Sequence, residues 1–322
     1  MNLDKVVEAI NQHDSFVILG HKNGDSDSYG AAFALAQILN KMNKSSAVML
    51  EKDFPDNLSF LLNYFTGDMI YQTDTKYDAL IILDVSDMSR VYSKETAEDF
   101  IKQSKKVIHL DHHTLGDLAN IAPVSFVDQD ACATSEIIYN LAAKLEIEIN
   151  KNIATCLLTG IVGDTGSFEN QNSTASSFNV AASLMNKGAR LRVIVSNAFE
   201  NKEIADLKLW GLALERLYYN PVYKTAITYI TKADLDKLSL DYEVISGVVN
   251  YLNSIKSAKM VVLITEDSIG TVKVSLRTRD NNMDVASLAR QLGGGGHVKA
   301  SGISMPGKIN ILKNGFITIG QP

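Results

Sequence analysis

The chain has 322 residues, of which 46% are hydrophobic and 21% charged, a composition that supports about two folded domains of roughly 100–200 residues and excludes a disordered chain. Its longest apolar runs, such as Met260–Ile264, are far shorter than the ~20 residues that span a bilayer. The first residues lack a basic leader followed by an apolar core, which is the pattern of a signal peptide. We therefore expect a cytoplasmic protein without a signal peptide or a membrane partner. The net charge of -6 disfavours binding of long nucleic acid, whereas clustered carboxylates suit divalent cations.

The first half of the chain contains apolar runs with the length of buried strands. Helix-like segments separate these runs, an arrangement typical of a parallel sheet that is covered on both faces. The runs are Phe16–Leu19, Ser46–Leu50, Ala79–Leu83 and Val107–Leu110. Polar residues follow directly after the strand ends, and in open α/β sheets this carboxyl edge binds ligands. We therefore predict an α/β fold whose N-terminal parallel-sheet domain carries the site at that edge.

Helical spacing of apolar residues predicts the intervening and following helices. The predicted helices are Ala31–Leu39, Lys151–Val162, Ser176–Lys187 and Lys202–Leu217. Gly188 is typical of a helix C-terminus, and Asn220-Pro221 ends the last helix.

The remaining residues predict a smaller α+β C-terminal domain. Its expected strands are Lys224–Ile230, Ala258–Glu266 and Thr271–Arg279, its expected helices are Glu243–Ile255 and Asp284–Leu292, and the Gly293–Gly296 run leads into a final strand near Ile303. The predicted organisation is a catalytic domain over 1–190, a helical linker over 191–220 and a substrate-binding domain over 221–322.

The first candidate motif is His21-Lys22-Asn23-Gly24-Asp25-Ser26-Asp27, which follows the first strand. The carboxylates of Asp25 and Asp27, one residue apart in an extended turn, point in different directions and can serve two adjacent hard cations. Asp and Asn next to Gly are also ordinary turn formers. By itself, this segment leaves both interpretations open.

The second candidate motif is Asp84 at the end of the Ala79–Leu83 run. A carboxylate that ends a buried strand is costly to desolvate unless it is paired or binds a metal, so Asp84 is a candidate to bridge two cations. It is alternatively an N-cap for the next helix, a role that Asp87 can also fill. Arg90 is either a contact to a substrate phosphate or a surface arginine.

Two further motifs follow in the same order as the strands. Asp111-His112-His113 ends the fourth run, and adjacent histidines at a strand end suit metal coordination or phosphate chemistry. Asp164 lies in Gly163-Asp164-Thr165-Gly166, where it is either a ligand or part of a plain helix terminator. The shared placement of these motifs at one sheet edge makes the combined signal stronger than each motif alone.

The succession HxxxDxD, a strand-terminal Asp, Asp-His-His and a late Gly-Asp-Thr resembles the DHH phosphoesterases. The segment Leu292–Gly302, with four glycines followed by His297, is similar to the GGGGH motif of the DHH-associated domain. Together with Val274–Arg277 and Asp284-Val285, it resembles the nano-RNase and pAp-phosphatase branch, which also includes stand-alone cyclic-dinucleotide phosphodiesterases. The resemblance spans nearly the whole chain.

This resemblance implies two Mn²⁺ ions as cofactors, and the absence of thiolates from the motifs is consistent with that metal. The implied ligands of one ion are His21, Asp25 and Asp84, and those of the other are Asp27, Asp84, His112 and Asp164. Asp84 would bridge the ions, His113 would lie near the scissile phosphate, and Asp111 would orient a histidine from behind. Two residues depart from the family pattern: Gly24 replaces a common proline and Ala31 a common serine, which puts the rigidity of the loop in doubt.

The resemblance also implies an active site in the cleft between the two domains, with the C-terminal domain holding the far end of the substrate. The residues expected to contact the substrate are Arg90, Arg277, Gly294, Gly295 and His297. The four glycines are alternatively a flexible linker.

The predicted function is Mn²⁺-dependent hydrolysis of short oligonucleotides or mononucleotides by a water that two cations activate. The expected substrates are nano-RNA or dinucleotides cut to mononucleotides, pAp cut to AMP, or linear and cyclic dinucleotides. One alternative is an inorganic pyrophosphatase or exopolyphosphatase of the same superfamily, although the Ser-Arg-Lys-Lys-Gln motif of these pyrophosphatases is absent from the sequence. Another is a non-catalytic nucleotide-binding module. Both a monomer and a homodimer fit the sequence.

Overall fold

The computed structural model describes residues 3–51, 54–71, 75–198, 203–240, 242–267, 270–312 and 317–320. The chain divides into two compact units, Met1–Asn201 and Lys202–Pro322. This division falls within 191–220, the segment that the sequence predicts as the connection. Each unit has its own sheet and its own cores, and the predicted α/β fold class is confirmed.

The first unit contains a parallel sheet whose strand order is β3-β2-β1-β4-β5-β6. Its strands are β1 Ser15–Leu19, β2 Ser45–Met49, β3 Asp68–Ile70, β4 Ala79–Leu83, β5 Lys106–Asp111 and β6 Val124–Val127. The chain first builds outward from β1 to β3, then returns to place β4 beside β1 and builds outward to β6. The direction of winding therefore switches between β1 and β4, and ligands bind at such a switch point.

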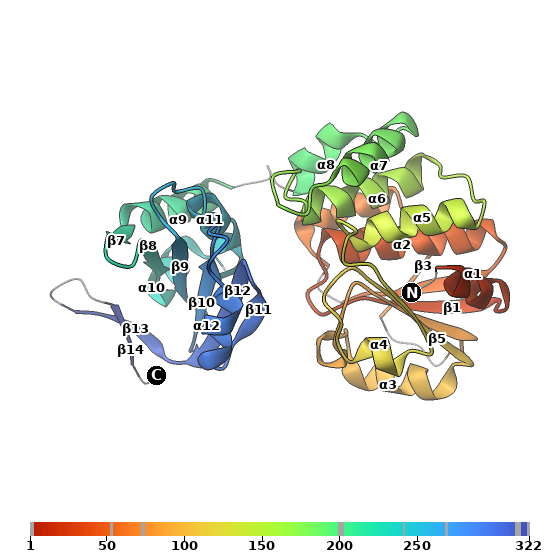
Figure 1. Ribbon diagram of the computed structural model, residues 1–322, viewed down its shortest axis with the longest axis horizontal. Helices are drawn as coiled ribbons and strands as arrows, with labels where there is room; N and C mark the ends of the chain where they lie inside the picture. Colours follow the sequence, from red (N-terminus) through yellow and green to blue (C-terminus); the bar gives the residue numbers. More distant parts are fainter. Residues whose placement is uncertain are drawn as a thin grey trace. The chain divides into compact units, whose positions relative to one another are not determined.

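Helices cover both faces of this sheet (Figure 1). The helical elements are α1 Asp4–Asn11, α2 Ser26–Lys41, η1 Asp56–Asn63, η2 Met88–Arg90, α3 Lys94–Gln103, α4 Leu118–Ile121, α5 Thr134–Lys144, α6 Lys151–Asp164, α7 Ala175–Asn186 and α8 Leu191–Ala198. Helices α2, α5 and α6 lie over one face, while α3 and α4 lie over the other.

The strands are continuously apolar because their side chains alternate between two buried cores. In β1, Phe16 and Ile18 pack into the core under α2 and α6, and Val17 and Leu19 pack into the opposite core with Phe100 of α3. A polar residue at any of these positions would lose its hydration on either face. Polar side chains are therefore restricted to the strand ends.

The helix expected over Ala31–Leu39 is longer than predicted and begins at Ser26. Asp25 is its N-cap, because its carboxylate accepts the backbone N–H groups of Asp27 and Ser28. The expectation that Asp25 and Asp27 share an extended turn is therefore wrong, since Asp27 lies in the first helical turn. Ser, Asp and Gly have low helix propensity, which concealed this first turn in the sequence.

Helices α2 and α6 approach closely where each carries a glycine. A Cβ atom on Gly30 would lie 2.5 Å from the carbonyl oxygen of Cys156, and a Cβ on Gly160 would lie 2.4 Å from Asp27 Oδ1. These glycines let α6 pass directly over the first turn of α2. The C-terminal end of α6 thereby reaches the carboxyl edge of the sheet with Asp164.

The second unit has a mixed sheet in the order β11-β12-β10-β9-β8-β7 and a separate hairpin of β13 and β14. Its strands are β7 Tyr218–Asn220, β8 Thr225–Ile230, β9 Met260–Glu266, β10 Thr271–Arg277, β11 Gly295–His297, β12 Ala300–Pro306, β13 Lys308–Ile311 and β14 Ile317–Gly320. Its helical elements are α9 Ile204–Glu215, α10 Lys232–Leu238, η3 Tyr242–Ile245, α11 Ser246–Leu252 and α12 Val285–Gln291. The strand near Ile303 is not the final one, because the hairpin follows it.

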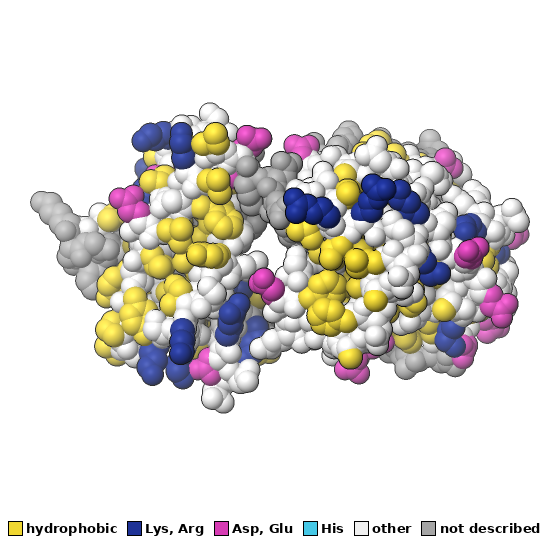
Figure 2. All heavy atoms as spheres, turned by 90° about the horizontal axis from the view of Figure 1, so that it is seen from above, with side chains coloured by type: hydrophobic (Ala, Val, Ile, Leu, Met, Phe, Trp, Pro, Cys, Tyr) yellow, Lys and Arg dark blue, Asp and Glu magenta, His cyan; other side chains and the backbone are white. Residues whose placement is uncertain are grey.

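The described residues include no helix that is long and apolar enough to cross a membrane. On the face shown in Figure 2, the described Lys and Arg side chains are interspersed with apolar and acidic ones.

The glycine contact between α2 and α6 predicts the effect of adding one methyl group. We expect Gly30→Ala to lower the free energy of unfolding by about 1–3 kcal/mol, because the methyl group must push two packed helices apart. Gly211→Ala is the matched change at an exposed position of α9, where an added Cβ meets nothing within 4 Å, and it should stabilise its unit by about 0.5–1 kcal/mol. Differential scanning calorimetry of both variants measures the effects; unchanged unfolding of Gly30→Ala would contradict the close contact.

Candidate metal centre

Three adjacent strands deliver polar residues to the carboxyl edge of the first sheet. His21 follows β1, Asp84 follows β4, and Asp111, His112 and His113 end β5. Because the sheet order is β1-β4-β5, these residues converge although they are far apart in the sequence. The convergence lies at the switch point of the sheet, where the sequence predicts the site.

His21, Asp25 and Asp84 form the first group of potential metal ligands. The Nε2 atom of His21 lies 3.7 Å from Asp25 Oδ2 and 3.6 Å from Asp84 Oδ2. His21 Nδ1 lies 2.8 Å from the carbonyl oxygen of Lys22, a contact that orients the ring and leaves Nε2 toward the carboxylates.

Asp27, His112 and Asp164 form the second group. Nε2 of His112 lies 2.9 Å from Asp164 Oδ2, but the two atoms are not aligned for a hydrogen bond, and this buried nitrogen has no hydrogen-bond partner among the described residues. The carboxylate of Asp27 is fully buried, and the backbone N–H groups of Thr134 and Ser135 donate to its two oxygens.

Asp84 belongs to the first group and to a third group of potential ligands, which it forms with His112 and His113. Its Oδ2 faces His21, whereas its Oδ1 lies 3.8 Å from His112 Nε2 and 3.6 Å from His113 Nδ1. The residue is 2% exposed and has a φ of 57°, a backbone conformation that is uncommon for residues other than glycine. Asp84 makes no helix cap, so the N-cap alternative is wrong.

Asp111 lies behind the histidines and holds them in place. Its Oδ1 accepts the backbone N–H groups of His112 and His113 and lies 2.8 Å from His113 Nδ1. Burial alone raises the pKa of Asp111, but these hydrogen bonds and the neighbouring histidines outweigh burial and lower the pKa. The residue thus stays ionised and fixes the orientation of His113, in agreement with its predicted geometry.

The loop before α2 is held firmly without the proline that the family often has at Gly24. The Lys22 N–H donates to the carbonyl of Arg90, and the Asn23 N–H donates to Glu51 Oε2. A Cβ on Gly24 would lie 2.7 Å from the ring of Tyr29, so this glycine makes room for that ring.

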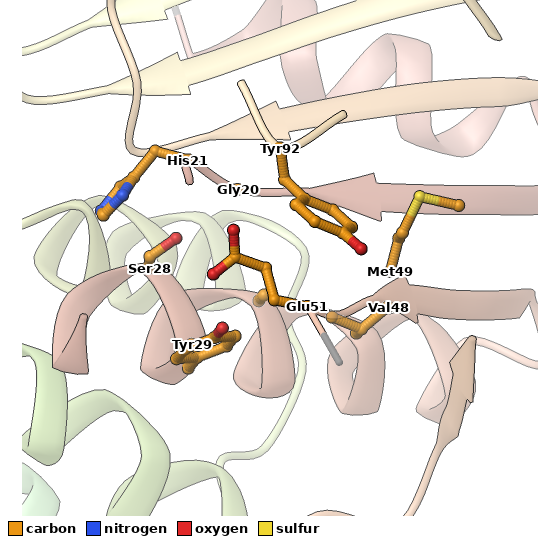
Figure 3. Close-up of a pocket in the computed structure, with 9 residues that line it drawn as sticks. Gly20, His21, Ser28, Tyr29, Val48, Met49, Glu51 and Tyr92 are labelled. Atoms are coloured by element: carbon orange, nitrogen blue, oxygen red, sulfur yellow. The ribbon is translucent and has the colours of Figure 1, made fainter. Parts of the chain in front are cut away.

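A small cavity adjoins this loop, and His21, Tyr29 and Glu51 are among the residues that line it (Figure 3). Its volume is about 10 Å³, which is room for one water molecule.

Burial and the charges of this cluster together raise the pKa values of two histidines and two carboxyl groups. Burial lowers the pKa of His21, but Asp25 and Asp84 outweigh it and raise the pKa to about 11. His112 behaves alike: burial lowers its pKa, but the surrounding carboxylates raise it to about 10. Burial and the charge of Asp164 raise the pKa of Asp27 to about 6, and burial together with Asp27 raises the pKa of Asp84 well above its ordinary value. Excess negative charge therefore dominates the site.

This donor set fits divalent cations. Within each group the ligand atoms lie within 4.8 Å of one another, and they are imidazole nitrogens and carboxylate oxygens. Such mixed hard and borderline donors suit ions such as Mn²⁺. The structure thus brings together all of the ligands that the sequence predicts, His21, Asp25, Asp27, Asp84, His112 and Asp164.

Thr134 and Ser135 contact the site but were missed by the sequence analysis. Their N–H groups bind Asp27, and Thr134 Oγ1 donates to Asp84 Oδ1. The N-cap residue of α5 is Ala133, whose side chain cannot accept a hydrogen bond from the first N–H groups of the helix. This missing cap indicates that another group accepts them, but it does not indicate which residue supplies that group.

The predicted substrate contacts lie in different environments. Arg90 is exposed at the end of η2, and its carbonyl accepts the N–H of Lys22 in the loop before α2. Arg277 is half-buried on β10, where burial lowers its pKa and its side chain donates to Asn250 Oδ1 and to the Leu276 carbonyl. The backbone of His297 belongs to β11, but its side chain lies outside the described residues.

The four glycines form ordered structure, so the flexible-linker alternative is wrong. The N–H groups of Gly293 and Gly294 donate to the carbonyls of Arg290 and Ala289 at the end of α12, and Gly295 and Gly296 begin β11. A Cβ on Gly294 would lie 2.2 Å from the Gly302 carbonyl oxygen. The N–H groups of Gly293 and Gly294 are therefore used within the unit. Substrate binding by Gly294 or Gly295 otherwise stays a prediction.

Family models match most of the chain. Residues 15–161 match the N-terminal domain of the DHH family, and residues 223–314 match the DHHA1 domain. These ranges contain every potential metal ligand except Asp164, which lies just after the first range.

Relatives and a solved structure resemble nearly the full chain. The chain is 28% identical to the bifunctional oligoribonuclease and PAP phosphatase NrnA of Mycoplasma genitalium, over 96% of this chain and 94% of that protein. It is 24% identical to the cyclic-di-AMP phosphodiesterase GdpP of Bacillus subtilis, over 95% of this chain but 48% of that protein. The fold matches the crystal structure of an exopolyphosphatase-related protein from Bacteroides fragilis with a TM-score of 0.86 at 24% identity, covering 95% of this chain and 91% of that one.

The raised pKa values of His21 and His112 predict how metal binding depends on pH. In the metal-free protein, pKa values of about 11 and about 10 keep both rings protonated at pH 7, whereas a metal ligand must be neutral. Ions must therefore displace these protons, and the apparent affinity for Mn²⁺ should increase from pH 6 to pH 9, by about tenfold per pH unit for each displaced proton.

Isothermal titration calorimetry in buffers of different ionisation enthalpy measures both the affinity and the protons released. Circular dichroism at each pH controls for loss of fold. An affinity that stays constant over this range, without proton release, would show that the histidines are not ligands.

Proposed function

Since this chain belongs to the DHH family and carries a DHHA1 domain, we propose that it is a manganese-dependent phosphoesterase that hydrolyses short nucleotide substrates. The observation that carries this proposal is the placement of the Asp84 oxygens, since Oδ2 lies 3.6 Å from His21 of the first group and Oδ1 lies 3.8 Å from His112 of the second. The family membership makes the chain a DHH phosphoesterase; the ion and the substrate are the parts proposed.

The residues of the site support hydrolysis of a phosphate ester. When bound, a pair of divalent cations supplies a water of lowered pKa and positive charge for the phosphoryl oxygens. Asp111 fixes the ring of His113, which is then positioned to stabilise the charge that grows on a phosphoryl oxygen. Asp84 would contribute to holding both cations, because its Oδ2 faces His21 and its Oδ1 faces His112.

The proposed substrates are nano-RNA or dinucleotides, pAp, and linear or cyclic dinucleotides. The names of NrnA and GdpP, which describe action on such compounds, support this range. The likeness to the exopolyphosphatase-related protein supports the fold alone. A catalytic site in a cleft between the units and formation of a homodimer stay predictions.

A turnover assay with Mn²⁺ tests the proposal. We expect dinucleotides or pAp to be hydrolysed to mononucleotides, pyrophosphate to be cleaved much more slowly, and chelation to abolish activity. A long circular single strand should stay intact, because the proposed substrates are short. Preferential cleavage of pyrophosphate or of the circular strand would exclude the proposed substrate class.

Asp84→Asn should reduce turnover more than replacement of any other single ligand, because Asp84 faces both groups. The matched control is Asp78→Asn, next to the opposite end of β4, where Asp78 forms an ion pair with Lys105 on the protein surface. Exposed ion pairs contribute little to the free energy of unfolding, so this variant should stay folded and retain wild-type turnover. Near-native activity of Asp84→Asn would contradict the shared carboxylate.

The DHHA1 domain is proposed to hold the end of the substrate that is remote from the scissile bond, with Arg277 binding a phosphate. Remote contacts position a substrate without taking part in chemistry. We therefore expect Arg277→Ala and His297→Ala to reduce kcat/KM for dinucleotides by more than tenfold, equivalent to more than about 1.4 kcal/mol. Hydrolysis of a minimal chromogenic phosphoester and Mn²⁺ affinity should change much less.

Lys308→Ala is the control, since it removes one positive charge from an exposed position of the same unit. Melting temperatures exclude a general loss of stability. Equal losses on the large and the small substrate would argue against substrate positioning by Arg277.

A further inference from the structure

The N-terminus of α5 lies directly against the candidate metal centre. Thr134 N–H donates to Asp27 Oδ2 at 2.6 Å, and Ser135 N–H donates to Asp27 Oδ1 at 2.9 Å. The first N–H groups of a helix have no partner within the helix and carry partial positive charge. Asp27, from α2, thus satisfies the N-terminus of α5, and both of its oxygens are fixed by backbone.

The side chain of Thr134 makes a second contact, to the shared carboxylate. Its Oγ1 donates to Asp84 Oδ1 at 3.1 Å. Both side chains are buried, with 0% exposure for Thr134 and 2% for Asp84. Water therefore cannot easily replace the donor, and a buried acceptor that loses its donor is costly.

The orientation of the Asp84 carboxylate decides which oxygen faces which group. The last torsion of an aspartate side chain has a broad range of allowed values, so the side chain by itself does not hold one rotation. In the structure, Oδ2 faces His21, and Oδ1 faces His112 and the Thr134 hydroxyl. The Thr134 hydroxyl donates to Oδ1 at 3.1 Å, whereas the nearest histidine nitrogens lie 3.6–3.8 Å from the two carboxylate oxygens.

We propose that Thr134 is a positioning residue, whose hydroxyl holds the Asp84 carboxylate in the rotation in which Oδ2 faces His21 and Oδ1 faces His112. This inference rests on the metal centre of the proposed function and adds a residue that none of the motifs contains. Thr134 acts through Asp84 and not on the substrate. Outer partners of metal ligands typically change metal affinity by about 10–100-fold when they are lost.

A purely structural role would involve the same residue differently. Thr134 also begins α5 within the main core, so its methyl group and its backbone N–H contribute to packing and to Asp27 binding whether or not the hydroxyl matters. Thr134→Val separates these roles, since it retains the shape and the N–H and removes only the hydroxyl. Thr134→Ser does the reverse, since it retains the hydroxyl and removes the methyl group.

Thr159→Val is the matched control. Thr159 is equally buried, on α6, and its hydroxyl donates to the carbonyl of Thr155 within the same helix. The change removes a buried hydroxyl without touching a metal ligand. Its effect on Mn²⁺ affinity therefore reports the cost of the substitution itself.

The measurement is titration of the metal-free full-length chain with Mn²⁺, followed by electron paramagnetic resonance of the unbound ion. We expect the wild type to bind two ions, Thr134→Val to bind them with at least about tenfold lower affinity, and Thr134→Ser and Thr159→Val to stay within about threefold of the wild type. Circular dichroism and thermal melting confirm that each variant is folded.

Wild-type affinity of folded Thr134→Val would overturn the inference, as would an equal loss of affinity in Thr134→Val and Thr134→Ser. Because the titration contains no nucleotide, a wild type that binds two ions but hydrolyses no nucleotide would contradict the proposed function and leave the role of Thr134 standing. A wild type that binds fewer than two ions would overturn both.

Discussion

The buried carboxylate of Asp84 is the group on which the rest of the site depends. It ends a strand that is apolar on both faces, it is 2% exposed, and Asp27 and Asp164 both raise its pKa by their negative charge. Such a concentration of negative charge is unfavourable unless positive charge offsets it. Protonated His21 and His112 offset part of it in the metal-free protein, and divalent cations can offset it when they displace those protons.

The surrounding helices stabilise this charge through their backbone. The N-terminus of α5 binds Asp27, and Asp25 caps the N-terminus of α2, so two helix ends with partial positive charge lie against the carboxylates. This arrangement requires close packing of α2 and α6, which Gly30 and Gly160 permit. The glycines in these helices therefore serve the site as well as the core, and a change in helix packing should disturb both.

Part of the site was predictable because it is encoded locally. An apolar run that stops at a carboxylate or a histidine shows where a buried strand ends, and the carboxyl edge of a parallel sheet collects such residues. His21, Asp84 and His112 follow this rule. The first turn of α2 did not, because Ser, Asp and Gly are weak helix formers and the cap that stabilises the turn is a side-chain contact.

The sequence by itself determined the class of the fold, the residues that follow β1, β4 and β5, and the chemical character of the site, because hydrophobic periodicity and residue type act over a few neighbouring positions. It did not predict the short strands β3 and β6. Only the tertiary structure decided that β4 lies beside β1, that the two oxygens of Asp84 face different groups, and that Thr134 bonds to Asp84. These contacts join residues that are distant along the chain, and they form only when the packing of sheet and helices sets both their separation and their orientation. No local pattern carries that information, since a threonine at the start of a helix looks the same whether or not a carboxylate from another strand lies within reach of its hydroxyl.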